Sequence, residues 1–74
     1  MTLRRHSVRI NGHRTSISIE DAFWDELNRI AAARGQSTSA LIAEIDRTRA
    51  SDDPPPNLSS ALRLHVLAVL KTGT

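Results

Sequence analysis

RTSISIE, residues 14–20, alternates polar and apolar side chains, and an apolar-periodic segment follows it directly. Successive side chains of a β-strand point to opposite faces of a sheet. The strand therefore has an apolar face and a polar, cationic face, made by Thr15, Ile17 and Ile19 and by Arg14, Ser16 and Ser18 respectively. A strand with one apolar face needs a partner strand as well as a surface to pack on. The simplest partner is the same strand of a second copy of the chain.

A two-stranded ribbon with hydroxyl groups and an arginine on its open side matches the width and donor–acceptor pattern of the DNA major groove. The charge distribution agrees with this interpretation. Residues 1–19 hold four arginines and no acid, a charge of +4, whereas residues 20–74 hold six basic and eight acidic residues, a charge of −2. A basic segment beside a strand is typical of a nucleic-acid-binding protein. A solvated, disordered basic arm is the alternative.

The size of the chain restricts how it can be stabilised. A domain of 74 residues buries only about 60% of its unfolded surface, so disulfides, metal or oligomerisation are expected to help. The chain has no cysteine, and its three histidines lack the spacing of metal ligands. We therefore expect a homodimer that holds no metal and no cofactor.

The sequence predicts neither a membrane protein nor an enzyme. No apolar run approaches the roughly 20 residues of a membrane span, and the N-terminus lacks the apolar core of a signal peptide. A cytoplasmic protein without membrane contact is expected. No histidine and carboxylate are spaced as the base for a serine nucleophile, and a Gly-rich phosphate loop is missing.

Asn11-Gly12 lies between two short β-prone runs and is a strong hairpin signal, because a type I′ turn needs two residues that tolerate positive φ. Two arrangements follow. Either residues 7–10 fold back on residues 14–17, and a dimer then has a four-stranded sheet, or residues 1–13 remain a basic arm beside a two-stranded ribbon.

Apolar periodicity predicts two helices after the strand. The first covers residues 21–34, with Gly35 as its C-terminal signal. The second begins after Ser37, its expected N-cap, and ends near Ala50.

A proline-rich connector and a third helix complete the chain. Three consecutive prolines in residues 51–57 favour an extended connector. The third helix, residues 58–71, is capped by Asn57 or Ser59 and is apolar nearly all round. Such a helix is expected to be buried on several sides, which a monomer of 74 residues could hardly provide and a dimer could.

Four segments together resemble the ribbon-helix-helix superfamily of dimeric bacterial and phage repressors: HRTSISIE, FWDEL, GQSTSALIAEI and NLSSALR. The resemblance covers roughly residues 4–70 and is closer still to a group of short bacterial ribbon-helix-helix proteins. It implies a mainly α fold with a short β-ribbon, in which residues 14–50 form the core of a homodimer and residues 58–71 add a C-terminal helix.

In that family the paired strands of two subunits lie in the DNA major groove. The resemblance therefore implies a sequence-specific transcriptional regulator that binds double-stranded DNA, with base contacts from Arg14, Ser16 and Ser18. Arginine can bind guanine through two hydrogen bonds, and hydroxyls can contact several bases. The alternatives are a plain exposed strand face for the serines and, for Arg14, an ion pair with an acid of the partner at position 20 or 21.

The family also binds phosphate through backbone amides at the start of the second helix. Here that segment is Gln36, Ser37, Thr38 and Ser39, and a helix N-terminus favours anions on physical grounds as well. N-capping is the ordinary role of Ser37. Further phosphate contacts are expected from the basic segment: Arg4, Arg5 and Arg9.

The expected dimer core takes apolar residues from the strand and all three helices: Ile17, Ile19, Phe23, Trp24, Leu27, Ile30, Leu41, Ile42, Ile45, Leu62 and Val66. Phe23 and Trp24 are assigned to this core rather than to base stacking because they fall near its helical stripe. His65 is expected to be a satisfied core or interface histidine.

Residues 1–13 and the third helix depart from the simplest members of the family, and either could cover part of the DNA surface. An antitoxin-like or other protein-interaction module that uses the C-terminal helix is therefore the alternative function. A dimerisation scaffold without DNA affinity is a third. An exposed apolar third helix favours the interaction module, and a buried one favours a structural role.

Overall fold

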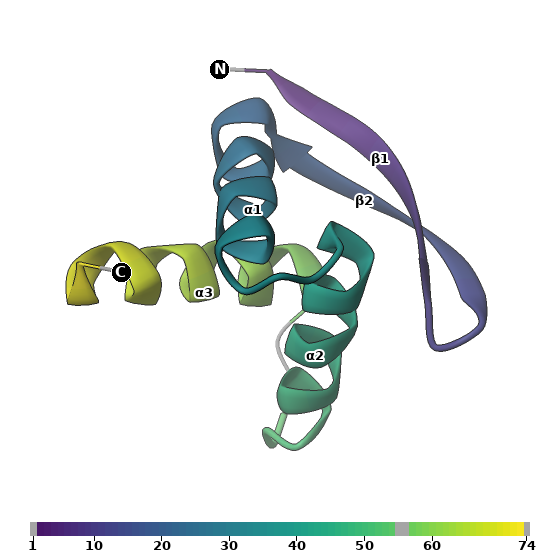
Figure 1. The fold of residues 1–74 in the computed structure, drawn as a ribbon. Helices are drawn as coiled ribbons and strands as arrows, with labels where there is room; N and C mark the ends of the chain where they lie inside the picture. Colours follow the sequence, from purple (N-terminus) through teal and green to yellow (C-terminus); the bar gives the residue numbers. More distant parts are fainter. Residues whose placement is uncertain (1, 55–56, 74) are drawn as a thin grey trace.

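The computed structural model describes residues 2–54 and 57–73 and contains a β-hairpin and three helices. The elements are β1 (Leu3–Ile10), β2 (His13–Glu20), α1 (Asp21–Ala33), α2 (Thr38–Ala50) and α3 (Leu58–Thr72). The hairpin lies against the helices, with β1 in contact with α2 and β2 in contact with α1 and α3 (Figure 1). The three helices also contact one another. Two of the three connector prolines, Pro55 and Pro56, lie outside the described residues.

The hairpin is closed by a two-residue turn. Asn11 and Gly12 have φ values of 51° and 80°, as a type I′ turn requires, and this turn matches the twist of the flanking strands. The strands pair along their whole length, from Ile10 opposite His13 to Leu3 opposite Glu20. The folded-back arrangement is therefore confirmed. β1 of the same chain occupies one edge of β2, and the pairing of β2 with another copy at its other edge stays a prediction.

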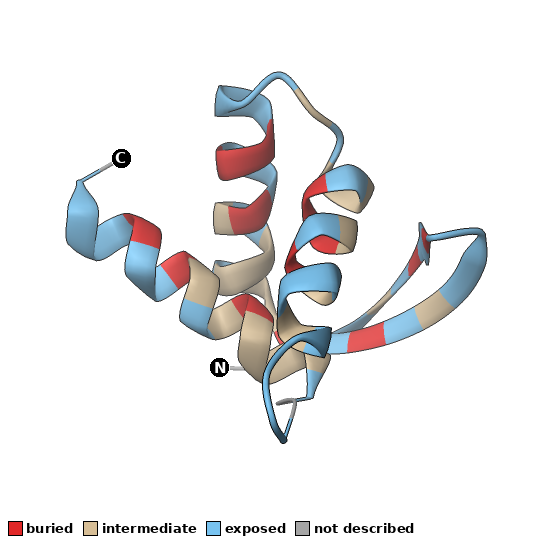
Figure 2. Ribbon diagram, turned by 90° about the horizontal axis from the view of Figure 1, so that it is seen from below, coloured by how far each residue is buried: buried red, intermediate tan, exposed pale blue. Residues whose placement is uncertain are grey.

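One apolar core joins all five elements (Figure 2). The inner face of the hairpin contributes four side chains that are at most 8% exposed: Val8, Ile10, Ile17 and Ile19. Most of the residues expected in a dimer core are already buried within one chain, namely Ile17, Ile19, Leu27, Ile30, Leu41, Ile42, Ile45, Leu62 and Val66. Phe23 and Trp24 are partly buried against them. A single chain therefore closes this core. The need of β2 for a partner strand no longer predicts that the chain folds only when it dimerises.

The helix ends follow local sequence signals. Gly35 has a φ of 68°, and the amides of Gly35 and Gln36 donate to the carbonyls of Ala32 and Ala31 at 3.1 and 3.0 Å. This pair of hydrogen bonds is a Schellman motif, which satisfies carbonyls that the end of α1 would otherwise leave unpaired. Ser37 caps α2 as predicted, since its Oγ accepts the Ala40 amide at 3.0 Å. Asn57 caps α3 in the same way.

α3 buries one side and exposes the other. Leu62, Val66 and Val69 point into the core. On the other side, Leu64, Leu67 and Leu70 are 60%, 50% and 52% exposed. Within the single chain, α1, α2 and the hairpin cover only one face of this helix. Its burial on several sides, expected for a dimer, stays a prediction. Among the described residues, no helix is long and apolar enough to cross a membrane.

Two further contacts fasten the hairpin to the helices. The His6 ring of β1 stacks on Trp24 of α1, with centroids 3.8 Å apart and planes 8° from parallel. At the start of α3, the Ser59 hydroxyl donates to the Ser18 carbonyl of β2 at 3.0 Å. The position of the hairpin is thus set by both strands.

We expect Leu62→Ala to lower the free energy of unfolding by about 2 to 5 kcal/mol, because it removes a fully buried side chain and leaves a cavity. Leu3→Ala is the matched control, since Leu3 is 54% exposed, and should change stability by no more than about 0.5 kcal/mol. Urea unfolding of the three proteins at one concentration measures both. Equal destabilisation by the two substitutions would contradict the packing of Leu62 in the core.

Candidate nucleic-acid interface

The outer face of the hairpin gathers polar and cationic side chains from both strands. The register places Arg5 opposite Ser18, Ser7 opposite Ser16 and Arg9 opposite Arg14. Directly opposed residues of an antiparallel pair lie on the same face of the sheet, and all six are exposed. The three predicted base-contact residues therefore lie together, and β1 adds three more side chains to the same face.

The turn also determines which backbone groups remain unpaired. In a two-residue hairpin the pair beside the turn, Ile10 and His13, exchanges backbone hydrogen bonds, and bonded and non-bonded pairs then alternate. The amides and carbonyls of Arg14, Ser16 and Ser18 consequently point away from β1, toward the open edge of β2. The Ser59 hydrogen bond agrees with this geometry, because it reaches the outward carbonyl of Ser18. Apart from the Ser18 carbonyl, which accepts from Ser59, the described backbone groups on this open edge of β2 are able to pair with a further strand.

The outer face carries uncompensated positive charge. Arg9 and Arg14 are directly opposed, and like charges in this position are destabilising without a counter-charge. In the part of the chain that the structure describes, Arg5, Arg9 and Arg14 form no ion pair. Such a face favours an anionic ligand.

The two acids that follow this face in sequence are already paired. Glu20 accepts from Nε of Arg63 at 2.8 Å, and this hydrogen bond holds the pKa of the Glu20 carboxyl below its usual range. Asp21 pairs with Nε of Arg4 at 2.9 Å. Within one chain, the acids considered as alternative partners for Arg14 are thus engaged by other arginines.

Arg4 lies apart from the other arginines of β1. Its cross-strand neighbour is Ile19, a residue of the inner face, and its guanidinium is held by Asp21 at the start of α1. The alternation of the strand therefore separates Arg4 from Arg5 and Arg9, although all three belong to one basic segment of the sequence.

Ser7 also lies on the outer face, where the sequence analysis did not place it. The Asn-Gly turn could have predicted this position of Ser7. A two-residue turn at Asn11 and Gly12 determines which residues of the two strands lie opposite each other.

The start of α2 offers backbone amides rather than side chains. Gln36 donates to Glu44 at 3.0 Å, the Thr38 hydroxyl donates to Asn28, and the Ser37 hydroxyl caps the helix. The amides of Thr38 and Ser39 have no acceptor among the described residues, as expected in the first turn of a helix. These two amides and the positive end of the helix dipole favour an anion at this position.

Comparison with known proteins agrees with this geometry. A family model described as a ribbon-helix-helix domain matches residues 3–70. The chain belongs to the ribbon-helix-helix family. No curated protein and no solved structure matches it. Membership supports a DNA-binding regulatory kind of function for this ribbon-helix-helix protein.

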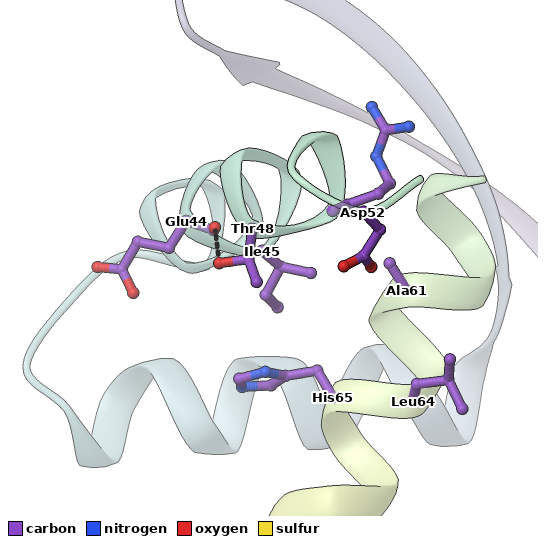
Figure 3. A pocket seen from close by; sticks show the side chains of 8 residues that line it. Glu44, Ile45, Thr48, Asp52, Ala61, Leu64 and His65 are labelled. Carbon is purple, nitrogen blue, oxygen red and sulfur yellow. Dashed lines mark hydrogen bonds between the residues drawn. The ribbon is translucent and has the colours of Figure 1, made fainter. Parts of the chain in front are cut away.

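A second feature of the ribbon-helix-helix chain is a hollow of about 310 Å³ between α2 and α3 (Figure 3). His65 lines it, and its Nε2 atom is buried without a hydrogen-bond partner among the described residues. The expectation of a satisfied core histidine is therefore wrong, and a satisfied interface histidine stays a prediction. Burial lowers the pKa of His65 below its ordinary value of 6.5; the charge of Arg34 adds to this effect, and that of Glu44 opposes it.

This pKa has a consequence for stability. A histidine whose pKa is lowered by folding binds its proton more readily in the unfolded chain. The free energy of unfolding should therefore be highest above pH 6.5 and should fall as the pH drops from there toward the lowered pKa. Glu20, whose pKa is lowered from 4.5, contributes only at more acidic pH.

We expect His65→Gln to flatten the decline in stability between neutral pH and pH ~5. His13→Gln, at the exposed start of β2, is the control and should leave that slope in place. Urea unfolding at a series of pH values measures the slope. An unchanged slope in His65→Gln would contradict the assignment.

Proposed function

We propose that this protein is a homodimeric, sequence-specific DNA-binding protein that regulates transcription by placing its β-ribbon in the major groove. The observation that carries the proposal is the outer face of the hairpin, where three arginines and three serines face solvent without an ion pair among the described residues. Arginine and hydroxyl side chains suit the donor–acceptor pattern of base edges. The family match supports the same kind of function.

The two strands take different roles in this proposal. Two copies joined at the open edge of β2 form the sheet β1-β2-β2-β1. With strands about 4.8 Å apart, the outer two lie roughly 14 Å from each other, whereas the major groove is about 12 Å wide. The central β2 strands therefore enter the groove, where Arg14, Ser16 and Ser18 contact bases. Each β1 lies over a groove wall, where Arg5 and Arg9 contact phosphates.

The start of α2 supplies the second phosphate contact through the amides of Thr38 and Ser39. Phosphate contacts fix the position of a protein on the duplex but do not read its sequence. Arg4 is held by Asp21 and is the weakest candidate of the basic segment for a phosphate contact.

We expect Arg14→Ala to weaken binding to the preferred duplex by about 1 to 3 kcal/mol for each base that Arg14 reads, and to reduce discrimination between sequences. Arg9→Ala should instead weaken binding to all sequences alike and reduce the slope of log affinity against log salt by about 0.9 for each phosphate that Arg9 neutralises. Arg47→Ala, on the exposed surface of α2, is the matched control. Fluorescence anisotropy with preferred and random duplexes at several salt concentrations measures all three.

The outcome for Arg14 decides the proposal. If Arg14→Ala kept both the affinity and the sequence preference of the wild type at fixed salt, the ribbon would not be the reading element. If the Arg9 and Arg14 variants both bound more weakly without any change in preference, the hairpin would bind phosphate only.

Dimerisation through β2 can be tested separately from DNA binding. Ser7 and Ser16 are opposed, and in this register their amides point to the outer edges of β1 and β2 respectively. Ser16→Pro should therefore block pairing at the β2 edge, whereas Ser7→Pro should leave it intact, because proline removes only an outward amide in each case. Analytical ultracentrifugation without DNA compares the two. Equal dimerisation of both variants would contradict the β2 edge as the interface.

An antitoxin-like interaction module is the second candidate function. The exposed leucines of α3 favour it, since contiguous apolar surface on a small protein marks an interaction site. Capture of a different protein by α3, with no binding of the hairpin to duplex DNA, would move this candidate ahead.

A further inference from the structure

The exposed side of α3 forms a continuous apolar stripe. Leu64, Leu67 and Leu70, spaced three residues apart, are at least half exposed. Leu64 and Leu67, with Ala68 and Lys71, also line a shallow surface hollow of about 340 Å³. Leu64 and Leu67 lie on the side of α3 away from Leu62 and Val66, so a substitution of either leaves the core of the chain in place.

The two ends of this stripe carry opposite charges. Lys71 lies in the last turn of α3. Asp52, just after α2, lines the hollow between α2 and α3 together with Leu64, and Figure 3 shows its carboxylate beside Ala61, about one helical turn before Leu64. Within residues 2–54 and 57–73, neither Lys71 nor Asp52 forms an ion pair.

We infer that the α3 stripe is covered by the α3 stripe of a second copy, with the two helices antiparallel. Leu64 and Lys71 are separated by two helical turns, about 10 Å. A twofold axis between Leu67 and Ala68 therefore brings each Lys71 next to Leu64 of the other copy, on the side of α3 where Asp52 lines the hollow. A parallel arrangement would instead place the two lysines together. Charge complementarity and self-complementary spacing thus favour a second copy over an unrelated partner.

This α3 interface does not depend on DNA binding and is distinct from the open edge of β2. It buries leucine side chains in the centre and places the charged pairs at the rim. Apolar anchors usually dominate the affinity of such an interface, whereas rim charges mainly set its orientation.

Sedimentation velocity without DNA, over a wide range of protein concentration, tests the inference. Leu67→Glu should weaken the α3-mediated association by about tenfold or more, because it places two like charges at the twofold axis. Leu3→Glu is the matched control, an equally exposed leucine on β1, and should assemble as the wild type does. Thermal unfolding monitored by circular dichroism confirms that both variants are folded.

Charge reversal identifies the occupant. Asp52→Lys and Lys71→Glu should each weaken association by about 2- to 5-fold, and the double variant should recover the wild-type value because the pairs re-form with opposite sign. This recovery is expected only if the partner is another copy in the antiparallel orientation.

Three outcomes would overturn the inference. The first is unchanged association in Leu67→Glu. The second is a double charge reversal in which the two effects simply add. The third is a different protein that binds the stripe while self-association is unaffected. Ser16→Pro separates the two interfaces, since it blocks the β2 edge and leaves α3 unchanged. If Ser16→Pro dissociated completely while Leu67→Glu still assembled, the α3 interface would be rejected. The dimer proposed for DNA binding would be retained.

Discussion

The two-residue turn at Asn11 and Gly12 is the constraint on which the rest of this structure depends. Its positive φ values fix the register of β1 and β2, and the register assigns every side chain of the hairpin to one of two faces. A shift of one residue would move the buried isoleucines to the solvent and the arginines into the core. The core and the candidate DNA surface are therefore two consequences of the same turn.

The hairpin changes what dimerisation has to do. In a chain with a single ribbon strand, a second copy would be needed to complete the sheet. Here β1 completes it, and the inner face is closed by the helices of the same chain. Dimerisation is then not needed to complete the sheet of one chain, and it can serve to form a binding surface. The open edge of β2 and the leucine stripe of α3 are two places where the described chain leaves such a surface.

Much of this arrangement could be predicted from the sequence, because its signals are local. The alternation of residues 14–20, the Gly35 stop and the Ser37 cap each depend on neighbours within a few positions. The partner strand of β2 was harder to predict from the sequence. Asn-Gly predicts a turn, but pairing over eight residues per strand also requires that Val8 and Ile10 pack against apolar residues of the core. The exposed side of α3 and the unsatisfied Nε2 of His65 depend on how three helices cross, which no local pattern specifies.

The main proposal is that the outer face of the hairpin binds DNA. The most direct test is a titration of isotope-labelled protein with duplex DNA, followed through the backbone amide signals by NMR. We predict the largest shifts at residues 5–9 and 14–18, with a second group at the start of α2 near Thr38. Shifts concentrated on α3, with an unperturbed hairpin, would contradict this assignment.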